Sequence, residues 1–483
     1  MDDSYDLVVI GAGPAGEIAA GLAAVFGRTV LVVERSSPGG VVTTTGGAPT
    51  KALREAALYL TGYRQEEVYG VRAAAPLEAV IPALRARIEQ VRDQLQKAIA
   101  DRFVTRGITY LQGTAHLDAA RTVHITLPDG QARDVTARTV LVATGSRPTH
   151  YPGIAYGDPD VYDSDEIYSL HSVPKDIVIV GGGPVGVEFA TVFTALGIPA
   201  TLVSNADRLL PNIDGEVAQL VADEFQRRGV RLVLGTGAER VRRVDGRLSV
   251  ALSTGSVLNP DAVLVCAGRT PNTEGLGLEQ AGVRTDARGR ILVDRYFRTS
   301  APGIYAAGDA VGVGLASGAM QQGRAAAAHA CGLVFGVEID QTASSAVYGI
   351  PEVASVGATE EQVHASGTPY TVGRCDLATT ARGAIAGHGG LLKLIFRTDN
   401  RQLLGVHCFG DIASEMVGLG HVVLQTGGRV ELFLTLALNT PTYSYAYHHA
   451  TVDGLIQLTE LMGTSASGST DTRPPQRPDP NSP

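Results

Sequence analysis

Cysteine is scarce in this chain, and its spacing excludes whole classes of site. The 483 residues include four cysteines, Cys266, Cys331, Cys375 and Cys408, which lie far apart in the sequence. They form no C-x-x-C pair and no spacing typical of a metal site. We therefore expect no metal centre and no local dithiol, and we expect Cys266, which lies within an apolar run, to be inert core.

Long apolar runs and clusters of basic residues are also missing. No stretch approaches the ~20 consecutive apolar residues that a membrane-spanning helix needs. The formal net charge is −9 and basic residues form no cluster, which argues against nucleic acid and membrane surfaces as partners. The acidic N-terminus runs directly into a predicted strand, so no signal peptide is expected. These absences predict a soluble, cytoplasmic protein.

The chain does contain a dinucleotide fingerprint near its N-terminus. An apolar run at residues 7–10 leads into the G-x-G-x-x-G motif from Gly11 to Gly16, an alanine-rich segment, and a second apolar run that ends in Glu34. The glycines allow a tight turn and let backbone N–H groups approach a pyrophosphate, while the acid accepts hydrogen bonds from a ribose. This arrangement predicts a βαβ unit that binds a dinucleotide.

The same unit occurs again 170 residues later. Residues 176–186 align with residues 6–16 without a gap, and the alignment continues to Ser204, which replaces Glu34. Two units predict two dinucleotides bound together. A carboxylate would repel a 2′-phosphate by roughly 4 kcal/mol per unit charge at ~4 Å and an effective dielectric of ~20. Because Ser204 and Asn205 can hydrogen-bond a hydroxyl or a phosphate, and Arg208 can reach the phosphate, we predict use of both NAD and NADP.

Other segments indicate how the chain is divided. Apolar residues at helical spacing predict a helix over residues 81–103 that packs on its own domain. Buried strands are predicted at 139–143, 262–266 and 303–307, each followed by a glycine turn. Alternating patterns from residue 347 predict strands, with a helix at 413–424. The residues after Met462 are rich in Ser, Thr, Pro and Arg, which predicts disorder.

The stretch from Gly39 to Leu53 resembles the flavin-facing active-site helix of the pyridine nucleotide-disulphide oxidoreductases, such as glutathione reductase. The order of motifs from Asp6 to about Leu461 resembles the same family. The two cysteines of the family are Val42 and Gly47 here. The family's His-Pro-Thr element reads Thr440-Pro441-Thr442, and Tyr445 stands at its glutamate. Without thiols or their acid–base pair, disulfide exchange is not expected.

Within the family, several strings look most like the soluble, FAD-containing pyridine nucleotide transhydrogenases. Those enzymes pass hydride from one nicotinamide cofactor to the other through FAD, without a functional disulfide. The strings are Gly145–Pro148, Val161–Asp165, Asp207–Leu210, Ile350–Gly357 and Leu404–Gly410.

The resemblance implies an α/β fold with two Rossmann-like dinucleotide-binding domains, for FAD and for NAD(P), and an α+β C-terminal dimerisation domain. It also implies a homodimer whose active sites are completed by the neighbouring subunit. The expected boundaries are 1–152 for the first part of the FAD domain, 153–272 for the NAD(P) domain, 273–345 for the second part of the FAD domain, 346–463 for the dimerisation domain and 464–483 for a disordered tail.

The resemblance also assigns site residues. Lys51 and Glu188 are the implied catalytic pair, which would hold a positive charge near the hydride-accepting edge of the flavin. Pro184 replaces a flavin-covering tyrosine and leaves the nicotinamide pocket more open. No metal ligand is implied. The implied cofactor-binding residues are Gly11, Gly13, Pro14, Ala15, Gly16, Glu34, Arg35, Gly40, Val41, Lys51, Ala115, Thr144, Gly145, Asp309, Leu315, Ala316, Ser317, Gly181, Gly183, Pro184, Val185, Gly186, Glu188, Ser204, Asn205, Arg208 and Gly268.

Three functions are compatible with these features. The first is a transhydrogenase using NAD(H) and NADP(H). The second is an NAD(P)H dehydrogenase that reduces a quinone, a dye or oxygen at the same flavin. The third is a flavoprotein whose cofactors serve sensing or assembly, which intact fingerprints argue against. His448 and His449 are candidate proton donors to a quinone, although exposure or packing at an interface explains them better, and the sequence does not name the hydride acceptor.

Overall fold

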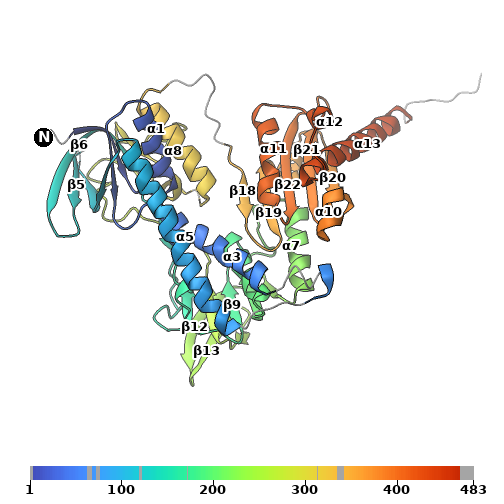
Figure 1. The fold of residues 1–483 in the computed structure, drawn as a ribbon, viewed down its shortest axis with the longest axis horizontal. Coiled ribbons are helices and arrows are strands. Elements are labelled where there is room, and N and C mark those ends of the chain that lie inside the picture. The colour runs from blue at the N-terminus through green and yellow to red at the C-terminus, as the bar shows by residue number, and fades with distance from the viewer. Residues whose placement is uncertain are drawn as a thin grey trace, which may run out of the picture.

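The computed structural model describes residues 4–61, 68–71, 77–118, 122–170, 172–312, 314–333 and 342–467. The described residues form three large sheets flanked by helices, with a smaller three-stranded sheet and a two-stranded ribbon beside them. The C-terminal sheet stands apart from the first (Figure 1). Within the described ranges, no helix has the length and apolar character needed to cross a membrane.

The first sheet is built around the first fingerprint. Its central strands are parallel, and β17 returns from far along the sequence to pair with β6. Alternate residues of β1 enter the cores on opposite faces, which explains its unbroken apolar run. The strands are β1 (Ser4–Ile10), β2 (Val30–Glu34), β3 (Thr109–Gln112), β4 (Thr114–Leu117), β5 (Thr122–Thr126), β6 (Ala132–Val142) and β17 (Ile304–Ala306).

The second sheet repeats this design and confirms the predicted βαβ units. Helix α1 (Pro14–Val25) and helix α6 (Pro184–Ala195) both have 12 residues, and their bounds differ by 170 positions. The parallel sheet has the order β11-β10-β9-β15-β8, and β12, β13 and β14 form a smaller antiparallel sheet beside it. The strands are β8 (Val161–Asp163), β9 (Ile177–Val180), β10 (Ala200–Ser204), β11 (Arg231–Leu234), β12 (Ala238–Val244), β13 (Arg247–Leu252), β14 (Val257–Leu258) and β15 (Ala262–Val265).

A two-stranded antiparallel ribbon joins the two units, where β7 (Ser146–Pro148) pairs with β16 (Arg269–Pro271). The other helical elements of these units are α2 (Val41–Thr44), α3 (Ala48–Leu60), α5 (Leu77–Thr105), α7 (Gly215–Arg227), α8 (Ala316–Ala330), η1 (Ile167–Ser169) and η2 (Gly308–Val311).

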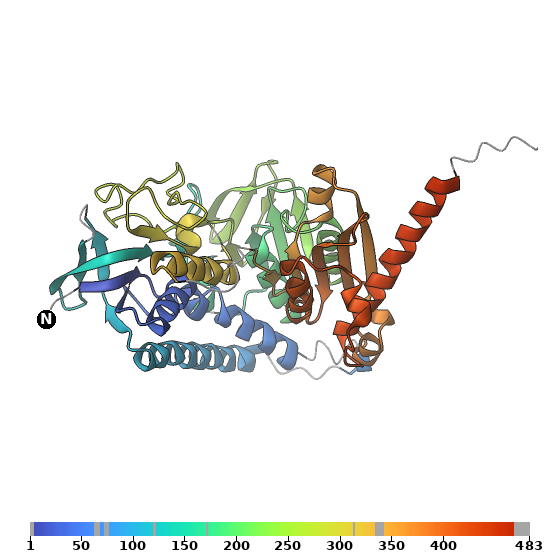
Figure 2. The same ribbon diagram turned by 90° about the horizontal axis from the view of Figure 1, so that it is seen from above.

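Helix α5 packs mainly on elements of its own domain, as expected, and its first half also joins the core of the second unit. Leu84 and Ile88 lie in the same core cluster as Phe189 of the second unit, whereas Ile99 and Phe103 pack into the core of the first unit. A helix of 29 residues is about 43 Å long, which exceeds one face of a single domain. The helix therefore runs along the first unit and reaches the second, as Figures 1 and 2 show.

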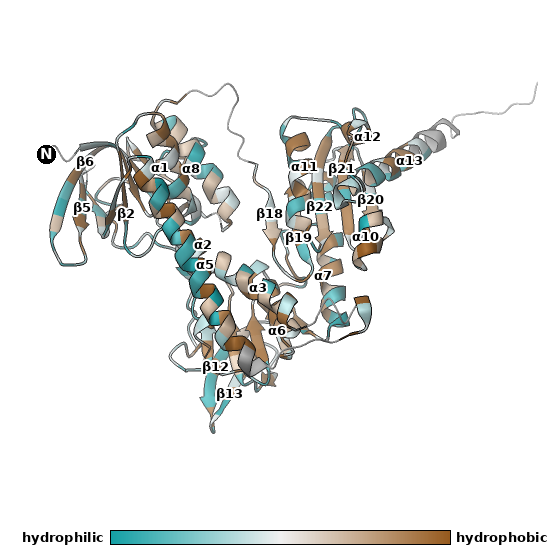
Figure 3. Cartoon of the chain, in the orientation of Figure 1, coloured by the Kyte–Doolittle hydropathy of each residue, from teal (hydrophilic) through white to brown (hydrophobic). Residues whose placement is uncertain are grey.

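The C-terminal sheet is antiparallel, and its strands lie where strands were predicted. The predicted alternation is not observed, because the first six residues of β21 are all buried. Figure 3 shows hydrophobic residues along β21 and β22 at its centre, and helices α11 and α13 pack on it. The elements are β18 (Ser345–Val347), β19 (Glu352–Gly357), α9 (Glu360–Ala365), β20 (Tyr370–Asp376), η3 (Leu377–Thr379), α10 (Ala381–Ala386), β21 (Leu391–Arg397), β22 (Leu403–Gly410), α11 (Ala413–Gln425), α12 (Leu432–Thr435), η4 (Tyr443–Tyr445) and α13 (Ala446–Ser467).

The prediction of disorder from residue 464 is wrong for its first four residues. Helix α13 continues to Ser467, because a formed helix extends at little cost once it is nucleated on a packed face. The remainder of the predicted tail, residues 468–483, lies outside the described residues.

Candidate active site

The first fingerprint forms an open loop at the N-terminus of α1. A side chain at Gly11 would lie 2.3 Å from the carbonyl oxygen of Ala143, and one at Gly16 would lie 2.0 Å from that of Gly11. Gly13, by contrast, has nothing within 4 Å of its Cβ position. Unpaired N–H groups and the helix dipole at this end suit a pyrophosphate, and Pro14 and Ala15 begin the helix beneath it. The loop therefore fits a dinucleotide.

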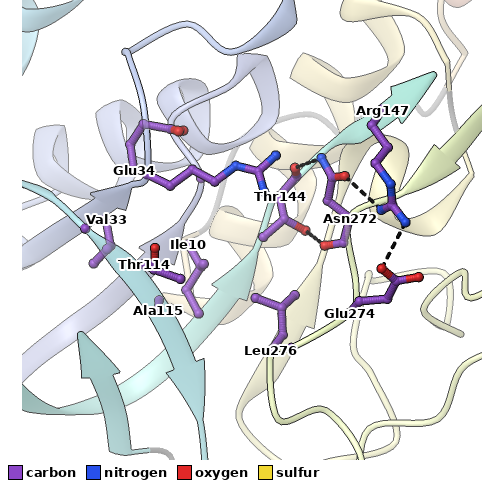
Figure 4. Close-up of a pocket in the computed structure, with 14 residues that line it drawn as sticks. Ile10, Val33, Glu34, Thr114, Ala115, Thr144, Arg147, Asn272, Glu274 and Leu276 are labelled. Atoms are coloured by element: carbon purple, nitrogen blue, oxygen red, sulfur yellow. Dashed lines mark hydrogen bonds and ion pairs between the residues drawn. The ribbon is translucent and has the colours of Figure 1, made fainter. Parts of the chain in front are cut away.

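A cavity of about 410 Å³ opens beside this loop, within the size range of ligand pockets (Figure 4). Glu34 lies at its wall, buried at the end of β2, and accepts a hydrogen bond of 2.8 Å from the Ala12 backbone N–H. Thr144 donates to the Asn272 carbonyl oxygen at 2.7 Å. Five predicted residues line this cavity, namely Gly11, Glu34, Arg35, Ala115 and Thr144.

Asp309 follows β17 and lies near the same fingerprint. Its carboxylate accepts a hydrogen bond of 2.5 Å from the Ser146 hydroxyl, which in turn accepts one of 2.8 Å from Arg269. Burial raises the pKa of Asp309, although Ser146 and Arg269 act in the opposite direction. Leu315 is the N-cap of α8, and Ala316 and Ser317 are its first residues. The helix packs tightly against α1, since a Cβ at Gly323 would meet the Ala15 carbonyl oxygen at 2.2 Å.

The second fingerprint repeats the open loop at the start of α6. Gly181 and Gly186 face each other as Gly11 and Gly16 do, and nothing lies within 4 Å of the Cβ position of Gly183. Pro184 and Val185 are the first residues of the helix. Gly145 and Gly268 lie in the connections between the two units, where Asn272 N–H donates to the Gly145 carbonyl oxygen and Thr149 N–H to that of Gly268.

Ser204 takes the place of Glu34 in this second unit. It is buried, and its hydroxyl oxygen accepts from the Ala206 backbone N–H at 3.2 Å. Asn205 lies against Gly237. Arg208, predicted to reach a phosphate, instead donates to the Glu361 carboxylate at 3.1 Å and to two nearby carbonyl oxygens. A phosphate would have to draw the guanidinium away from these partners.

Lys51 and Glu188 are brought together from the two units. The ammonium of Lys51, on α3, lies 2.9 Å and 3.1 Å from the two carboxylate oxygens of Glu188, on α6. The side chain of Glu188 is 7% exposed and that of Lys51 is 30% exposed. Glu188 therefore holds one side of the ammonium, and the other side remains partly exposed.

Tyr348 completes this pair and was not predicted. Its ring lies beneath the Lys51 ammonium, 4.8 Å from Nζ to the ring centroid, and its backbone N–H donates to Glu188 at 2.9 Å. Burial raises the pKa of Tyr348. No local pattern identifies this residue, because it lies in the connection between β18 (Ser345–Val347) and β19 (Glu352–Gly357) and reaches the pair only through packing.

Gly40 and Val41 lie where the active-site segment meets the fingerprint. A Cβ at Gly40 would lie 3.1 Å from the Cα of Gly13, and α2 begins at Val41. Further along, a Cβ at Gly47 would lie 2.5 Å from both the Cα and the carbonyl oxygen of Val42. Real Cβ atoms do not approach so closely, so the segment would have to change shape to carry a cysteine at position 47.

None of the thiols that the chain does have lies in the α2–α3 segment, although Cys266 packs against the second fingerprint, 3.3 Å from where a Cβ at Gly186 would lie. The Cys266 sulfur lies 3.4 Å from the Val180 carbonyl oxygen, and burial raises its pKa to about 12. Burial likewise raises the pKa of Cys375 to about 11. All four cysteines are free. These thiols stay protonated at neutral pH and are poor nucleophiles.

His448 and His449 lie at the start of α13 with Tyr445. The Tyr445 ring stacks on His448 at 5.1 Å and meets His449 edge-on at 5.3 Å. In both views α13 lies across the molecule from α1 (Figures 1 and 2). Within one chain, the structure therefore does not bring these rings to the first fingerprint.

Comparisons with known proteins agree with this geometry. The pyridine nucleotide-disulphide oxidoreductase family matches residues 5–323, and the dimerisation domain of that family matches residues 343–451. A soluble pyridine nucleotide transhydrogenase of Mycobacterium bovis (strain BCG / Pasteur 1173P2) is 38% identical over 471 residues, which cover 95% of this chain and 98% of that protein. One from Pseudomonas entomophila (strain L48) is 36% identical over 464 residues, covering 94% and 99%.

Solved structures show the same fold. The crystal structure of LpdA from Mycobacterium tuberculosis superimposes with a TM-score of 0.85 at 29% sequence identity. The superposition covers 92% of this chain and 99% of the LpdA chain. The similarity therefore extends over both dinucleotide units and the C-terminal sheet.

Proposed function

Because the chain belongs to the pyridine nucleotide-disulphide oxidoreductase family, we propose that it transfers hydride between NADPH and NAD⁺ through a bound FAD. The observation that carries the proposal is the Lys51–Glu188 pair beside a segment without thiols. The residues for hydride transfer are retained, whereas those for disulfide exchange are absent. Transhydrogenase relatives over nearly the full length of the chain support the same reaction.

FAD, when bound, supplies the chemistry of accepting and releasing hydride. The first fingerprint, Glu34 and Asp309 would hold it, and the second fingerprint would hold the nicotinamide cofactor. Glu188 fixes the Lys51 ammonium through both carboxylate oxygens. A fixed positive charge stabilises negative charge that develops beside it, since the group need not reorganise during the reaction.

In this proposal both NAD and NADP are used, because Ser204 places no carboxylate beside the ribose. We expect neither cofactor to be preferred by more than ~1000-fold, which corresponds to about 4 kcal/mol. Purified protein assayed with NADH and with NADPH tests this expectation through kcat/KM. A larger ratio in either direction would contradict it.

Replacing Ser204 by glutamate should make the second unit resemble the first, which has Glu34 at the equivalent position. Glu34 accepts from the Ala12 N–H, and the corresponding donor for residue 204 is Gly182 N–H. The new carboxylate should lower kcat/KM for NADPH by about 100-fold or more through repulsion of the 2′-phosphate, with a small effect on NADH. Ser204→Gln is the matched control, because it has similar size without charge. Equal losses for both cofactors would contradict this role.

One assay tests the proposed reaction. The FAD-loaded protein is mixed anaerobically with NADPH and a thionicotinamide analogue of NAD⁺, and formation of the reduced analogue is followed. We expect turnover. An alternative acceptor, a quinone reduced at the same flavin, is tested in parallel under the same conditions. Quinone turnover without analogue reduction would favour that alternative, and a flavin that NADPH does not reduce would contradict both reactions.

Assembly, boundaries and location belong to the same proposal. A homodimer is supported by the match to a dimerisation domain and by exposed apolar side chains on α11, α12 and α13, among them Val422, Leu432 and Ile456. Domain boundaries after residues 152 and 272 are supported by the return of β17 to the first sheet. The boundary proposed after residue 345 falls at the first residue of β18, which begins the C-terminal sheet. Four free cysteines support a reducing, cytoplasmic location.

A further inference from the structure

The turn between α2 and α3 determines where Lys51 lies. At one end, Gly39 N–H donates to the Ala12 carbonyl oxygen at 2.8 Å, which ties this segment to the first fingerprint. At the other end, Lys51 is in the first turn of α3. Between them, Gly46 and Gly47 give the backbone more conformational freedom than any other residue would. Because positions 42 and 47 carry no cysteine, no covalent bond closes this turn.

Tyr168 closes it with hydrogen bonds instead. The hydroxyl of Tyr168, in η1, donates to the carbonyl oxygen of Thr45 at 2.5 Å and is 2.6 Å from the hydroxyl of Thr50. Thr45 is the C-cap of α2, and Thr50 is buried in the first turn of α3. One hydroxyl group from the segment before the second fingerprint therefore joins both helices across the glycine pair.

Two further contacts hold the same turn. The Thr45 hydroxyl donates to the Asp165 carboxylate at 3.0 Å, and Arg92 of α5 donates to the carbonyl oxygen of Thr44 at 2.9 Å. Carbonyl groups in the last turn of a helix have no partner within the helix, so external donors define their position. Burial raises the pKa of Tyr168, so its hydroxyl remains a donor at neutral pH.

We propose that Tyr168 is a positioning residue for the hydride transfer, and that its hydroxyl holds the α2–α3 turn, and through it Lys51, in place of a covalent link. This inference rests on the proposed function, since it concerns the same flavin site. The phenol ring itself packs edge-on against Phe189, 6.2 Å between ring centroids, so the ring is seated independently of the hydroxyl group.

The expected size of the effect follows from geometry. A displacement of about 1 Å in a reacting group can slow a reaction by ~100-fold. Tyr168→Phe keeps the ring and removes only the hydroxyl group. We expect FAD reduction by NADPH to slow by about 10- to 100-fold, with FAD still bound, an unchanged KM for NADPH and a shifted flavin absorption spectrum.

Tyr447→Phe is the matched control. Tyr447 is fully buried in the C-terminal domain, where its hydroxyl donates to the Met416 carbonyl oxygen at 2.9 Å and accepts from Gly420 N–H at 3.1 Å. Its loss removes the same number of hydrogen bonds from the fold without contact to the α2–α3 turn. We expect the control to lower the unfolding midpoint while leaving the flavin spectrum and reduction rate unchanged.

The two variants separate positioning from a merely structural role. Wild-type reduction rate and flavin spectrum in Tyr168→Phe would overturn the proposal, as would a folded variant that fails to retain FAD. Single-turnover reduction by NADPH is measured without a second acceptor, so failure of the wild-type protein to reduce the NAD⁺ analogue would contradict the proposed function alone. Slowed reduction in Tyr168→Phe would then still support the positioning role.

Discussion

Replacing Lys51 by methionine should slow reduction of FAD by NADPH by about 100-fold while FAD remains bound. Removing one fixed electrostatic group from an active site typically costs ~10²–10³ in rate. Methionine keeps the length of the side chain, so the loss reports on the charge. Stopped-flow measurement of flavin bleaching under anaerobic conditions gives the rate, and absorbance of the purified variant gives the FAD content.

Lys97→Met controls for the removal of a lysine as such. Lys97 pairs with Asp101 on the exposed surface of α5, where the two side chains are 75% and 61% exposed. Exposed pairs contribute little, so this variant should match the wild type. An unchanged reduction rate in Lys51→Met would remove Lys51 from the reaction. Loss of FAD from that variant would assign it to cofactor binding instead.

The largest effect on stability should come from Lys393→Met. Lys393 on β21 is 1% exposed and Asp214 at the start of α7 is 0% exposed, with 2.9 Å between the ammonium and the carboxylate. The ammonium also lies 2.9 Å from Glu216 and 2.6 Å from Glu360. Removing one partner of a buried ion pair leaves an uncompensated charge and typically costs about 3–5 kcal/mol. Because this cluster joins α7 to the C-terminal sheet, the contact between these two elements should break before the rest of the protein unfolds.

Hydrogen exchange of α7 and β21 measures this loss directly, and the thermal midpoint should fall by roughly 10 °C. Arg397→Met is the control on the same strand. Arg397 pairs with Asp399, and the side chains are 32% and 57% exposed. That change should cost less than ~1 kcal/mol. Equal losses in the two variants would contradict the importance of the buried cluster.

The same cluster predicts a pH window for stability. Burial lowers the pKa of Lys393, but hydrogen bonds to Glu360, Asp214 and Glu216 outweigh it and raise the pKa overall. Burial raises the pKa of Glu216, but Arg374 and Lys393 outweigh it and lower the pKa overall. The lysine's contribution is therefore lost only as pH rises above about 10.5, and the glutamate's only as pH falls below about 4.5. In Lys393→Met, stability should therefore fall less steeply as the pH rises into the alkaline range.

Local sequence patterns were sufficient for the two βαβ units. The strand–glycine–helix order of residues 6–34 and its copy 170 positions later depend on interactions between near neighbours. The structure reproduces this order in both units, although β1 begins three residues earlier than its copy β9. The open loops at Gly13 and Gly183 follow from the same patterns. The family resemblance added the Lys51–Glu188 pair, which neither periodicity nor spacing alone could have joined.

What the patterns missed depends on packing between units. The apolar face of α5 is compatible with packing on one domain or on two. Only the assembled structure shows that its residues enter the cores of both units. Tyr348 and Tyr168 lie in segments without a motif of their own. Arg208 carries a charge suited to a phosphate, yet Glu361 from the C-terminal domain engages it.

The amino-acid sequence alone determined which segments fold into nucleotide-binding units, and that the segment from Gly39 to Leu53 has no thiol. The tertiary structure decided which side chains meet: Lys51 and Glu188 are 137 residues apart, Tyr168 and Thr45 are 123 apart, and Lys393 and Asp214 are 179 apart. Helical and strand periods reflect contacts within a few residues of the chain, whereas these contacts depend on how three separately formed units pack against one another.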